Sequence, residues 1–327
     1  MTFQAIRVDK TEAGQNVRFV EMDAHELMDG DVTVRVTHST VNYKDGLALS
    51  GKSAIPRKFP LVLGIDLAGI VESSAHDGFR PGDAVFVNGF GLGETHSGGF
   101  SQLARVKGDW LLKIPEGWSG AEVMAVGTAG YTAALSVDAI EAAGIGPSVG
   151  PAVVTGAAGG VGSVAIALLA KAGWSVIAST GRASEADYLK SLGASEIIAR
   201  ESLSGPAKLL GKERWAAGVD SVGSQTLANL LSQTRYGGAI AACGLAGGMD
   251  LPTSVAPFIL RGVKLLGIES VNCPMGPRRA AWARIVRDLD RAKLAEITTT
   301  APFELLFEIG ADIVAGKVRG RVVIEIG

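Results

Sequence analysis

Two patterns of apolar and polar positions divide the chain near residue 122. Before that point, short segments such as residues 32–37 alternate between apolar and polar side chains, with Gly, Pro and Asp turns between them. This alternation predicts half-buried strands in a barrel-like sheet. We expect these strands at residues 1–8, 32–37, 69–72, 84–87 and 104–106.

Beyond residue 122, apolar runs and helical segments follow one another in turn. A helix rich in small residues is expected at 124–142, with later helices at 162–172, 183–192 and 224–235. The predicted strands lie at 152–155, 174–179, 195–198, 218–222, 238–243 and 263–268. This order is typical of βαβ units in a doubly wound parallel sheet. A polar helix at 277–288 follows, and an alternating strand at 320–326 is expected to return to the first domain.

A glycine-rich turn stands between the strand at 152–155 and the helix at 162–172. Residues 153–163 read Val-Val-Thr-Gly-Ala-Ala-Gly-Gly-Val-Gly-Ser. Such a turn lets the backbone approach a pyrophosphate, and the helix N-terminus offers N–H donors and a partial positive charge. Aligned on Gly159 and Gly162, Ala157 replaces the first glycine of G-x-G-x-x-G. The motif predicts a bound dinucleotide, and the alternative is a plain strand–helix turn without a ligand.

The end of the next strand indicates which dinucleotide is bound. A NAD-preferring site usually places Asp or Glu there, against the ribose 2′-hydroxyl. Here the strand at 174–179 is followed by Thr180, Gly181 and Arg182, so a guanidinium stands where the acid would be. This favours a 2′-phosphate and hence NADPH. The alternative for Arg182 is a solvated arginine at the start of a helix.

Composition and charge exclude several classes of protein. The chain has 327 residues, 47% of them apolar and 20% charged, which is enough for two domains with sizeable cores. The net charge is −2 and no basic patch is present, so no nucleic-acid partner is expected. We expect neither a secretory signal nor a membrane span, because no apolar run has the required length and setting. Cys243 and Cys273 are too few for a disulfide framework, and the cytoplasm is the expected compartment.

Five segments together resemble a known family. They are Phe-Pro-Leu-Val-Leu-Gly-Ile-Asp at 59–66, Gly-Leu-Gly-Glu-Thr-His-Ser-Gly-Gly at 91–99, Arg-Val-Lys-Gly-Asp-Trp at 105–110, Gly-Thr-Ala-Gly-Tyr-Thr-Ala at 127–133 and Ala-Cys-Gly-Leu-Ala-Gly-Gly at 242–248. With the order of the domains, they resemble the acryloyl-CoA reductase group, a zinc-free branch of the medium-chain dehydrogenase/reductase superfamily near the quinone oxidoreductases. The resemblance implies an α/β protein with a GroES-like β-barrel catalytic domain and a Rossmann domain with a doubly wound parallel sheet. We place the former at residues 1–122, completed by 269–327, and the latter at 123–268.

No metal is expected in this chain. Zinc-using members of the superfamily need thiolate or imidazole ligands around an open position. Their Gly-His-Glu turn aligns with Gly64, Ile65 and Asp66, so isoleucine replaces the histidine ligand, and no cysteine precedes Cys243. The four histidines have no ligand spacing, and we expect each to be hydrogen-bonded or at the surface.

The resemblance implies that residues 40–45 form the catalytic loop. Reduction of an enoyl thioester delivers hydride to the β-carbon, builds negative charge on the thioester oxygen and ends with protonation of the α-carbon. Asn42 and Tyr43 are the expected hydrogen-bond donors, Tyr43 is also expected against the nicotinamide, and Asp45 completes the catalytic set. In the alternative interpretation the loop is a turn into a helix that Asp45 caps. Lys44 is expected to be a solvated surface charge.

The resemblance also implies further contacts. The pyrophosphate is expected at Ala158, Gly159, Gly160 and Val161. The adenosine ribose and its phosphate are expected at Thr180, Gly181, Arg182 and Arg200. The nicotinamide half is expected beside Leu245, Ile259 and Ser270, with core packing as the alternative for the first two. Candidate ligands for the phosphates of coenzyme A are Arg278 and Arg279, with two solvated helical arginines as the alternative.

The expected activity is the NADPH-dependent reduction of a short 2-enoyl-CoA, specifically of acryloyl-CoA to propionyl-CoA. The alternatives are an NADPH:quinone or alkenal oxidoreductase and a non-catalytic binding module, and the glycine turn and Arg182 argue against the last. The strand at 263–268 is expected at an edge of the sheet, where unpaired backbone groups favour pairing. The resemblance implies a homodimer through that edge. In the alternative, the helix at 277–288 covers the edge and the chain stays monomeric.

Overall fold

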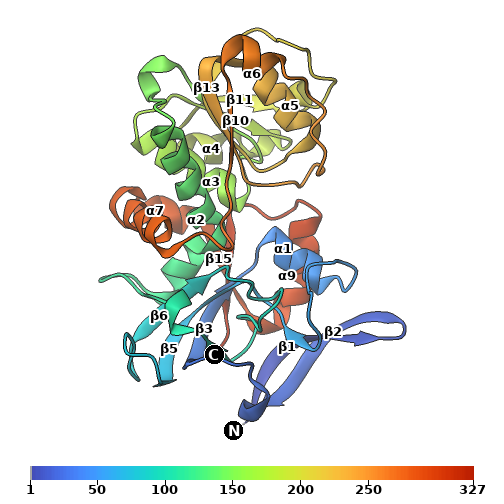
Figure 1. Cartoon of the computed structure of the whole chain (residues 1–327), viewed down its shortest axis with the longest axis vertical. Coiled ribbons are helices and arrows are strands. Elements are labelled where there is room, and N and C mark those ends of the chain that lie inside the picture. The colour runs from blue at the N-terminus through green and yellow to red at the C-terminus, as the bar shows by residue number, and fades with distance from the viewer. Residues whose placement is uncertain (1) are drawn as a thin grey trace. The chain divides into compact units, whose positions relative to one another are not determined.

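The computed structural model describes residues 2–327, which form two compact units (Figure 1). Unit 1 comprises the chain up to Thr128 together with Thr298–Gly327, and unit 2 comprises Ala129–Ile297. The sequence interpretation placed the boundaries at 122 and 268. The difference arises because α7 (Met275–Asp288) and α8 (Arg291–Ile297) pack on α3 (Gly160–Lys171), so the segment at 269–297 belongs with unit 2.

Unit 1 is built from two β-sheets. The smaller sheet has the order β2-β1-β4, and the larger runs β15-β16-β3-β5-β6-β8 with β7 paired to β3. The strands are β1 (Thr2–Thr11), β2 (Gly14–Asp23), β3 (Val32–Thr40), β4 (Leu61–Val62), β5 (Asp66–Ser74), β6 (Ala84–Asn88), β7 (Leu103–Val106), β8 (Leu112–Lys113), β15 (Thr298–Pro302) and β16 (Arg321–Glu325). Val32, Val34 and Val36 are buried along β3, so the period-two pattern that predicted this strand also fills the core.

The last strand, β16, returns to unit 1 as predicted. It pairs antiparallel with β3, with Val323 opposite Thr40. Two helices of unit 1, α1 (Tyr43–Leu49) and α9 (Leu306–Val314), pack on each other. Segments separated by most of the sequence therefore meet at the end of β3.

The sequence analysis missed strand β2. This strand pairs with β1 along its whole length, yet most of its side chains are exposed or half-buried. The alternation in its sequence is interrupted at the adjacent apolar residues Phe19 and Val20, and β2 therefore escaped detection. Strand β15 was also missed, because its sequence, Thr-Thr-Thr-Ala-Pro, has no alternation.

Unit 2 contains a six-stranded parallel sheet with the order β11-β10-β9-β12-β13-β14, and helices lie on both sides of it (Figure 1). The strands are β9 (Ala152–Val154), β10 (Val176–Thr180), β11 (Ala194–Ala199), β12 (Trp215–Asp220), β13 (Thr234–Ala242) and β14 (Lys264–Gly267). The remaining helices are α4 (Ala186–Leu192), α5 (Ser224–Ser232) and α6 (Ala256–Arg261). The doubly wound sheet is thus confirmed, and its strand order reverses between β9 and β12, where such sheets bind their ligands.

Helix α2 (Gly120–Ala142) is longer than predicted and crosses the boundary between the units. Gly127 interrupts it with a left-handed backbone (φ 51°, ψ −165°). Its length and composition would suffice to cross a membrane, contrary to the expectation that no segment reaches that length. However, 78% of its most apolar window is buried inside the protein, which is typical of a core helix.

Candidate functional site

A buried polar cluster lies where β3 ends and β5 begins. It consists of Asn42, Asp45, Asp66 and Arg321, and each of these side chains is less than 8% exposed. Because β3 and β5 run antiparallel, the end of one strand lies beside the start of the other. The sequence therefore brings the loop at 40–45 next to the Gly-Ile-Asp turn at 64–66, two segments that were considered separately.

Asp66 is at the centre of this polar cluster. Its carboxylate accepts hydrogen bonds from Asn42 Nδ2 at 2.7 Å, Asn88 Nδ2 at 2.5 Å and Thr128 Oγ1 at 2.7 Å. The backbone N–H of Thr128 also donates to the carboxylate. Asp66 occupies the glutamate position of the zinc-family turn, and sequence analysis did not recognise it as a candidate site residue.

The structure corrects the expected donor role of Asn42. Its Nδ2 group has two N–H bonds, and these point to Asp45 Oδ2 at 2.9 Å and Asp66 Oδ2 at 2.7 Å. Its Oδ1 accepts from Arg321 Nη1 at 3.2 Å. Asn42 is therefore committed to holding the polar cluster together, and its amide has no N–H left for a substrate oxygen.

Arg321 neutralises part of the negative charge of the polar cluster. It is 2% exposed and donates to three further oxygens, of Ala125 and Val41 in the backbone and of the Thr40 side chain. Burial lowers the pKa of the Arg321 guanidinium, while the charges of Asp66 and Asp45 act in the opposite direction. One signal for this residue was present in the sequence, because Arg321 directly precedes the apolar run of the last predicted strand.

Asp45 is an acid held in unfavourable surroundings. It is 1% exposed, and burial, followed by the nearby charge of Asp66, raises the pKa of its carboxyl to about 7. It accepts from the backbone N–H groups of Asn42 at 2.8 Å and Ile65 at 3.0 Å. The expected capping of α1 by Asp45 is present. The same carboxyl can therefore gain and lose a proton near neutral pH.

Tyr43 and Lys44 begin α1 beside the polar cluster. Tyr43 is 38% exposed and is the most accessible residue of this loop. Lys44 is not the solvated charge that was expected. Its Nζ lies 2.8 Å from Oε1 of Glu94, whose side chain is only 10% exposed, so Lys44 is fixed by an ion pair.

In unit 2 the glycine turn has the expected form, between β9 and α3. Gly159 is the N-cap residue of α3, and Ala158, Gly160 and Val161 surround it. A Cβ atom at Gly162 would lie 2.4 Å from the carbonyl oxygen of Gly156, so only glycine allows this approach of helix to turn. The turn fits a pyrophosphate, whose contacts here stay a prediction.

Two guanidinium groups gather after β10, where the 2′-phosphate is expected. Thr180 Oγ1 accepts from the backbone N–H of Arg182 at 3.1 Å. A Cβ atom at Gly181 would lie 2.7 Å from Cζ of Arg200, so the Arg200 side chain lies directly over this glycine. Arg182 also approaches Glu185, with 3.8 Å between Nε and Oε1. The structure thus brings Arg200 next to the contiguous residues Thr180, Gly181 and Arg182.

Asp220 organises the crevice end of this sheet and was missed by sequence analysis. Its buried carboxylate, at the end of β12, accepts from Thr155 Oγ1 at 2.6 Å and from the backbone N–H of Gly223 at 2.8 Å. Burial raises the pKa of the Asp220 carboxyl. These bonds fix the loops after β9 and β12 on both sides of the point where strand order reverses.

The residues expected near the nicotinamide are accessible. Leu245 is 53% exposed and Ile259 is 73% exposed, so the alternative of core packing is wrong for both. Ser270 is half-buried, and its carbonyl oxygen accepts from Arg278. Their contact with a cofactor stays a prediction.

Arg278 needs a correction. It is 1% exposed, its Nη2 lies within 3.3 Å of the carbonyl oxygens of Ser270, Val271 and Cys273, and its guanidinium lies over the ring of Tyr131. These contacts leave it bound inside unit 2, neither a solvated helical arginine nor a handle for coenzyme A. Arg279 is exposed, and its expected role stays a prediction.

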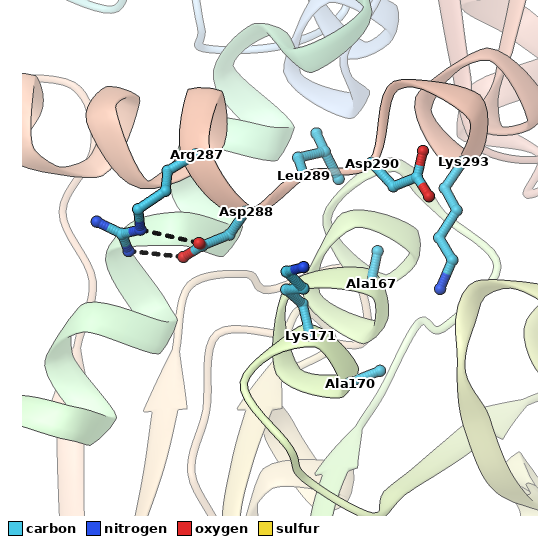
Figure 2. Close-up of a pocket in the computed structure, with 8 residues that line it drawn as sticks. All are labelled: Ala167, Ala170, Lys171, Arg287, Asp288, Leu289, Asp290 and Lys293. Carbon is cyan, nitrogen blue, oxygen red and sulfur yellow. Dashed lines mark hydrogen bonds and ion pairs between the residues drawn. The ribbon is translucent and has the colours of Figure 1, made fainter.

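A pocket of about 330 Å³ in unit 2 lies between α3 and the segment that joins α7 to α8 (Figure 2). Most of its charged side chains already have partners. Arg287 binds Asp288 with two hydrogen bonds, and Lys293 Nζ donates to the carbonyl oxygen of Leu192 at 2.8 Å. With acids and bases interspersed, this pocket offers no single charge to a ligand.

Comparison with known proteins first identifies the class. Residues 28–116 match the family model for the alcohol dehydrogenase GroES-like domain, and residues 160–288 match the model for zinc-binding dehydrogenase. These are the two domains of medium-chain dehydrogenase/reductases. Acrylyl-CoA reductase AcuI of Ruegeria pomeroyi is 50% identical over 327 residues, with 99% of each chain covered. The chain belongs to the acrylyl-CoA reductase family of this superfamily.

Two solved structures support this assignment. The yhdH oxidoreductase of Salmonella enterica, in complex with NADP, has a TM-score of 0.96 and 46% identity, covering 99% of this chain and 100% of that one. The Bacillus subtilis protein yhfP, with NAD bound, has a TM-score of 0.94 and 45% identity, covering 99% of both. The YhfP sequence is named a putative quinone oxidoreductase.

The donor set does not fit the zinc in the name of the matched family model. Ile65 stands in the ligand turn, and nowhere in residues 2–327 do three His, Cys, Asp or Glu side chains gather in a metal-binding arrangement. Each histidine has a hydrogen-bond partner instead, as predicted: His25 with Asp23, His38 with Thr37, His76 with Asp109, and His96 with two backbone carbonyls.

Proposed function

We propose that this chain reduces a short 2-enoyl-CoA with NADPH, specifically acryloyl-CoA to propionyl-CoA. The observation that carries the proposal is the buried polar cluster beside Tyr43, in a chain 50% identical to an acrylyl-CoA reductase. NADPH, when bound, supplies the hydride for the β-carbon of the substrate. The residues of this chain then have to stabilise charge on the thioester oxygen and deliver a proton to the α-carbon.

Tyr43 is the residue that we assign to the thioester oxygen. Its accessible hydroxyl can donate a hydrogen bond to the developing enolate, and its ring can pack against the nicotinamide. Asn42 and Asp45 then act as positioning residues, because their polar atoms are committed to one another and to Asp66. Asp45, with its pKa of about 7, can exchange a proton with the loop near neutral pH.

For the cofactor, we propose separate contacts for the pyrophosphate, the adenosine ribose with its phosphate, and the nicotinamide half. The turn at 158–161 holds the pyrophosphate, and Thr180, Gly181, Arg182 and Arg200 hold the ribose and its phosphate. Leu245, Ile259 and Ser270 flank the nicotinamide half. Bound NADP in the Salmonella relative supports NADPH, and bound NAD in the Bacillus relative makes Arg182 and Arg200 the residues to test.

The test of this function is a substrate panel. Turnover is measured with NADPH and with NADH on acryloyl-CoA, crotonyl-CoA, a quinone and an alkenal. The highest kcat/KM is expected for acryloyl-CoA with NADPH. Faster turnover of the quinone or the alkenal would replace the proposal by the alternative that the YhfP name favours, and no turnover of any of them would favour a binding module.

We also propose that the chain is a cytoplasmic homodimer that pairs through β14. This strand is the edge of the sheet, and α7 does not cover it, since α7 packs on α3 and binds Asp138 and Glu141 of α2 through Arg284. Exposed apolar side chains occur on β14 at Leu265 and on the preceding helix α6 at Leu260. Light scattering should therefore give twice the chain mass of 33.6 kDa. The free cysteines Cys243 and Cys273 agree with a reducing compartment.

A further inference from the structure

A second pocket, of about 450 Å³, lies within unit 1 and has no role in the function proposed so far. Aromatic and cationic side chains line it: Phe90, Trp110, Lys58, Lys107 and His96, together with Met28, Asp29 and Thr95. The rings of Phe90 and Trp110 are stacked, with 5.6 Å between their centroids and an interplanar angle of 4°. Both lysines are exposed, and Nζ of Lys107 lies 5.6 Å from the centre of the Trp110 ring.

The aromatic wall of this pocket is held rigidly. Phe90 has a φ of 52°, a left-handed conformation that residues other than glycine rarely adopt. His96 packs edge-on against Trp110, and its two ring nitrogens lie 3.0 Å from the carbonyl oxygens of Ser97 and Asp29. Residues in rarely populated backbone conformations cluster at active sites and ligand-binding sites, so the conformation of Phe90 supports a functional role for the pocket.

The pocket is joined to the polar cluster by short stretches of chain. Phe90 follows Asn88, whose side chain donates to Asp66, and the N–H of Gly89 donates to the carbonyl oxygen of Ile65 at 3.1 Å. Thr95 follows Glu94, which binds Lys44 beside the catalytic loop. The loops that line the pocket are therefore hydrogen-bonded to the polar cluster and to the start of the catalytic helix, beside which the thioester is expected to react.

The chemistry of the pocket fits a nucleotide. A flat aromatic wall stacks on a base, and lysines bind phosphate as point charges. A neutral quinone would form no ion pair with either ammonium group. Resting on the function proposed above, we propose that this pocket binds the adenosine 3′-phosphate 5′-pyrophosphate end of coenzyme A, with the adenine against Trp110 and the phosphates at Lys58 and Lys107.

The test compares two thioesters that differ only in this nucleotide, acryloyl-CoA and S-acryloyl-pantetheine. The double variant Lys58→Ala/Lys107→Ala should raise KM for acryloyl-CoA about tenfold or more and leave KM for the pantetheine thioester unchanged. The matched control is Lys113→Ala, a lysine of unit 1 that lies over an aromatic ring outside the pocket, and it should change neither. An equal rise for both thioesters, or no rise for acryloyl-CoA, would overturn the proposal.

A second measurement separates this proposal from the proposed activity. Binding of adenosine 3′,5′-bisphosphate is measured by calorimetry on protein saturated with NADP⁺, so that the dinucleotide site is filled. The wild type should bind, and both the double variant and Trp110→Leu should bind about tenfold more weakly. Unchanged binding in these variants refutes the nucleotide pocket. A wild type that binds the bisphosphate but reduces neither thioester refutes the activity and keeps the pocket.

Discussion

The protonation of Asp45 makes the stability of the protein depend on pH in an unusual direction. An ordinary aspartate has a pKa of 3.8, whereas burial and the charge of Asp66 raise the pKa of Asp45 to about 7. Between about pH 4 and pH 7 the folded chain therefore holds a proton that the unfolded chain has released. The free energy of unfolding contributed by this group falls as the pH rises through that window.

The size of the effect follows from linkage. One extra proton in the folded state corresponds to a slope of at most about 1.4 kcal/mol per pH unit. Asp45→Asn removes the titration and keeps the size of the side chain. The variant loses one acceptor, because an amide nitrogen cannot accept the bond that a carboxylate oxygen takes, and this costs about 1–3 kcal/mol at every pH. The free energy of unfolding of the wild type minus that of the variant should therefore decrease steadily from pH 4.5 to pH 7.

The assay is urea unfolding at pH intervals from 4.5 to 7.5, followed by far-UV circular dichroism and by tryptophan fluorescence, whose coincidence supports a two-state treatment. Asp83→Asn is the matched control. Hydrogen bonds from Lys113 and Arg80 lower the pKa of the Asp83 carboxyl, so this group is ionised in the folded and the unfolded chain throughout this range. The difference in unfolding free energy between the wild type and Asp83→Asn should therefore not change with pH. If the unfolding free energy of the wild type minus that of Asp45→Asn stays constant or grows with pH, the pKa of Asp45 is not raised.

Other predictions concern the cofactor, the catalytic loop, the metal and the edge strand. Arg182→Ala should weaken NADPH binding about 10- to 150-fold and leave NADH nearly unchanged, and equal loss for both would contradict a 2′-phosphate contact. Tyr43→Phe should lower kcat about 10²- to 10⁴-fold if its hydroxyl serves the enolate, whereas near-normal kcat would make Tyr43 a packing wall. Activity should be unchanged in EDTA and the purified protein should hold no stoichiometric zinc, which elemental analysis checks. Leu266→Pro removes one ladder donor of β14 and should halve the mass seen by light scattering, while an intact dimer would place the interface elsewhere.

The sequence predicted the doubly wound sheet well because its four central strands, β10, β9, β12 and β13, are largely buried on both faces. All six parallel strands were predicted, since continuous apolar runs between helical segments have few other interpretations. The polar elements of unit 1 were harder, because β2 and β15 bury little and carry no continuous alternation. Boundaries between the units depended on which helix packs on which, and a chain pattern does not contain that information.

The candidate site was predicted only in its local parts. The glycine turn and the Thr-Gly-Arg segment are contiguous, so their chemistry is visible in the sequence. The polar cluster joins Asn42 to Asp66 and Arg321, and only the pairing of β3 with β5 and β16 brings them together. The burial of Arg278 was also missed. Its neighbour Arg279 has the same side chain and lies at the surface, so the residue type alone does not tell the two apart.

The pairing of β16 with β3 also sets an order of events during protein synthesis. Arg321 binds Thr40 across 281 residues of sequence, and all of unit 2 is made in between. At 5–20 residues per second, roughly 15–55 seconds pass between the two. Through that interval no guanidinium charge stands near Asp45 and Asp66 to offset their carboxylates, so the two acids cannot be buried together at low cost. The polar cluster of unit 1 therefore cannot form until unit 2 and the C-terminal strand β16 have been synthesised.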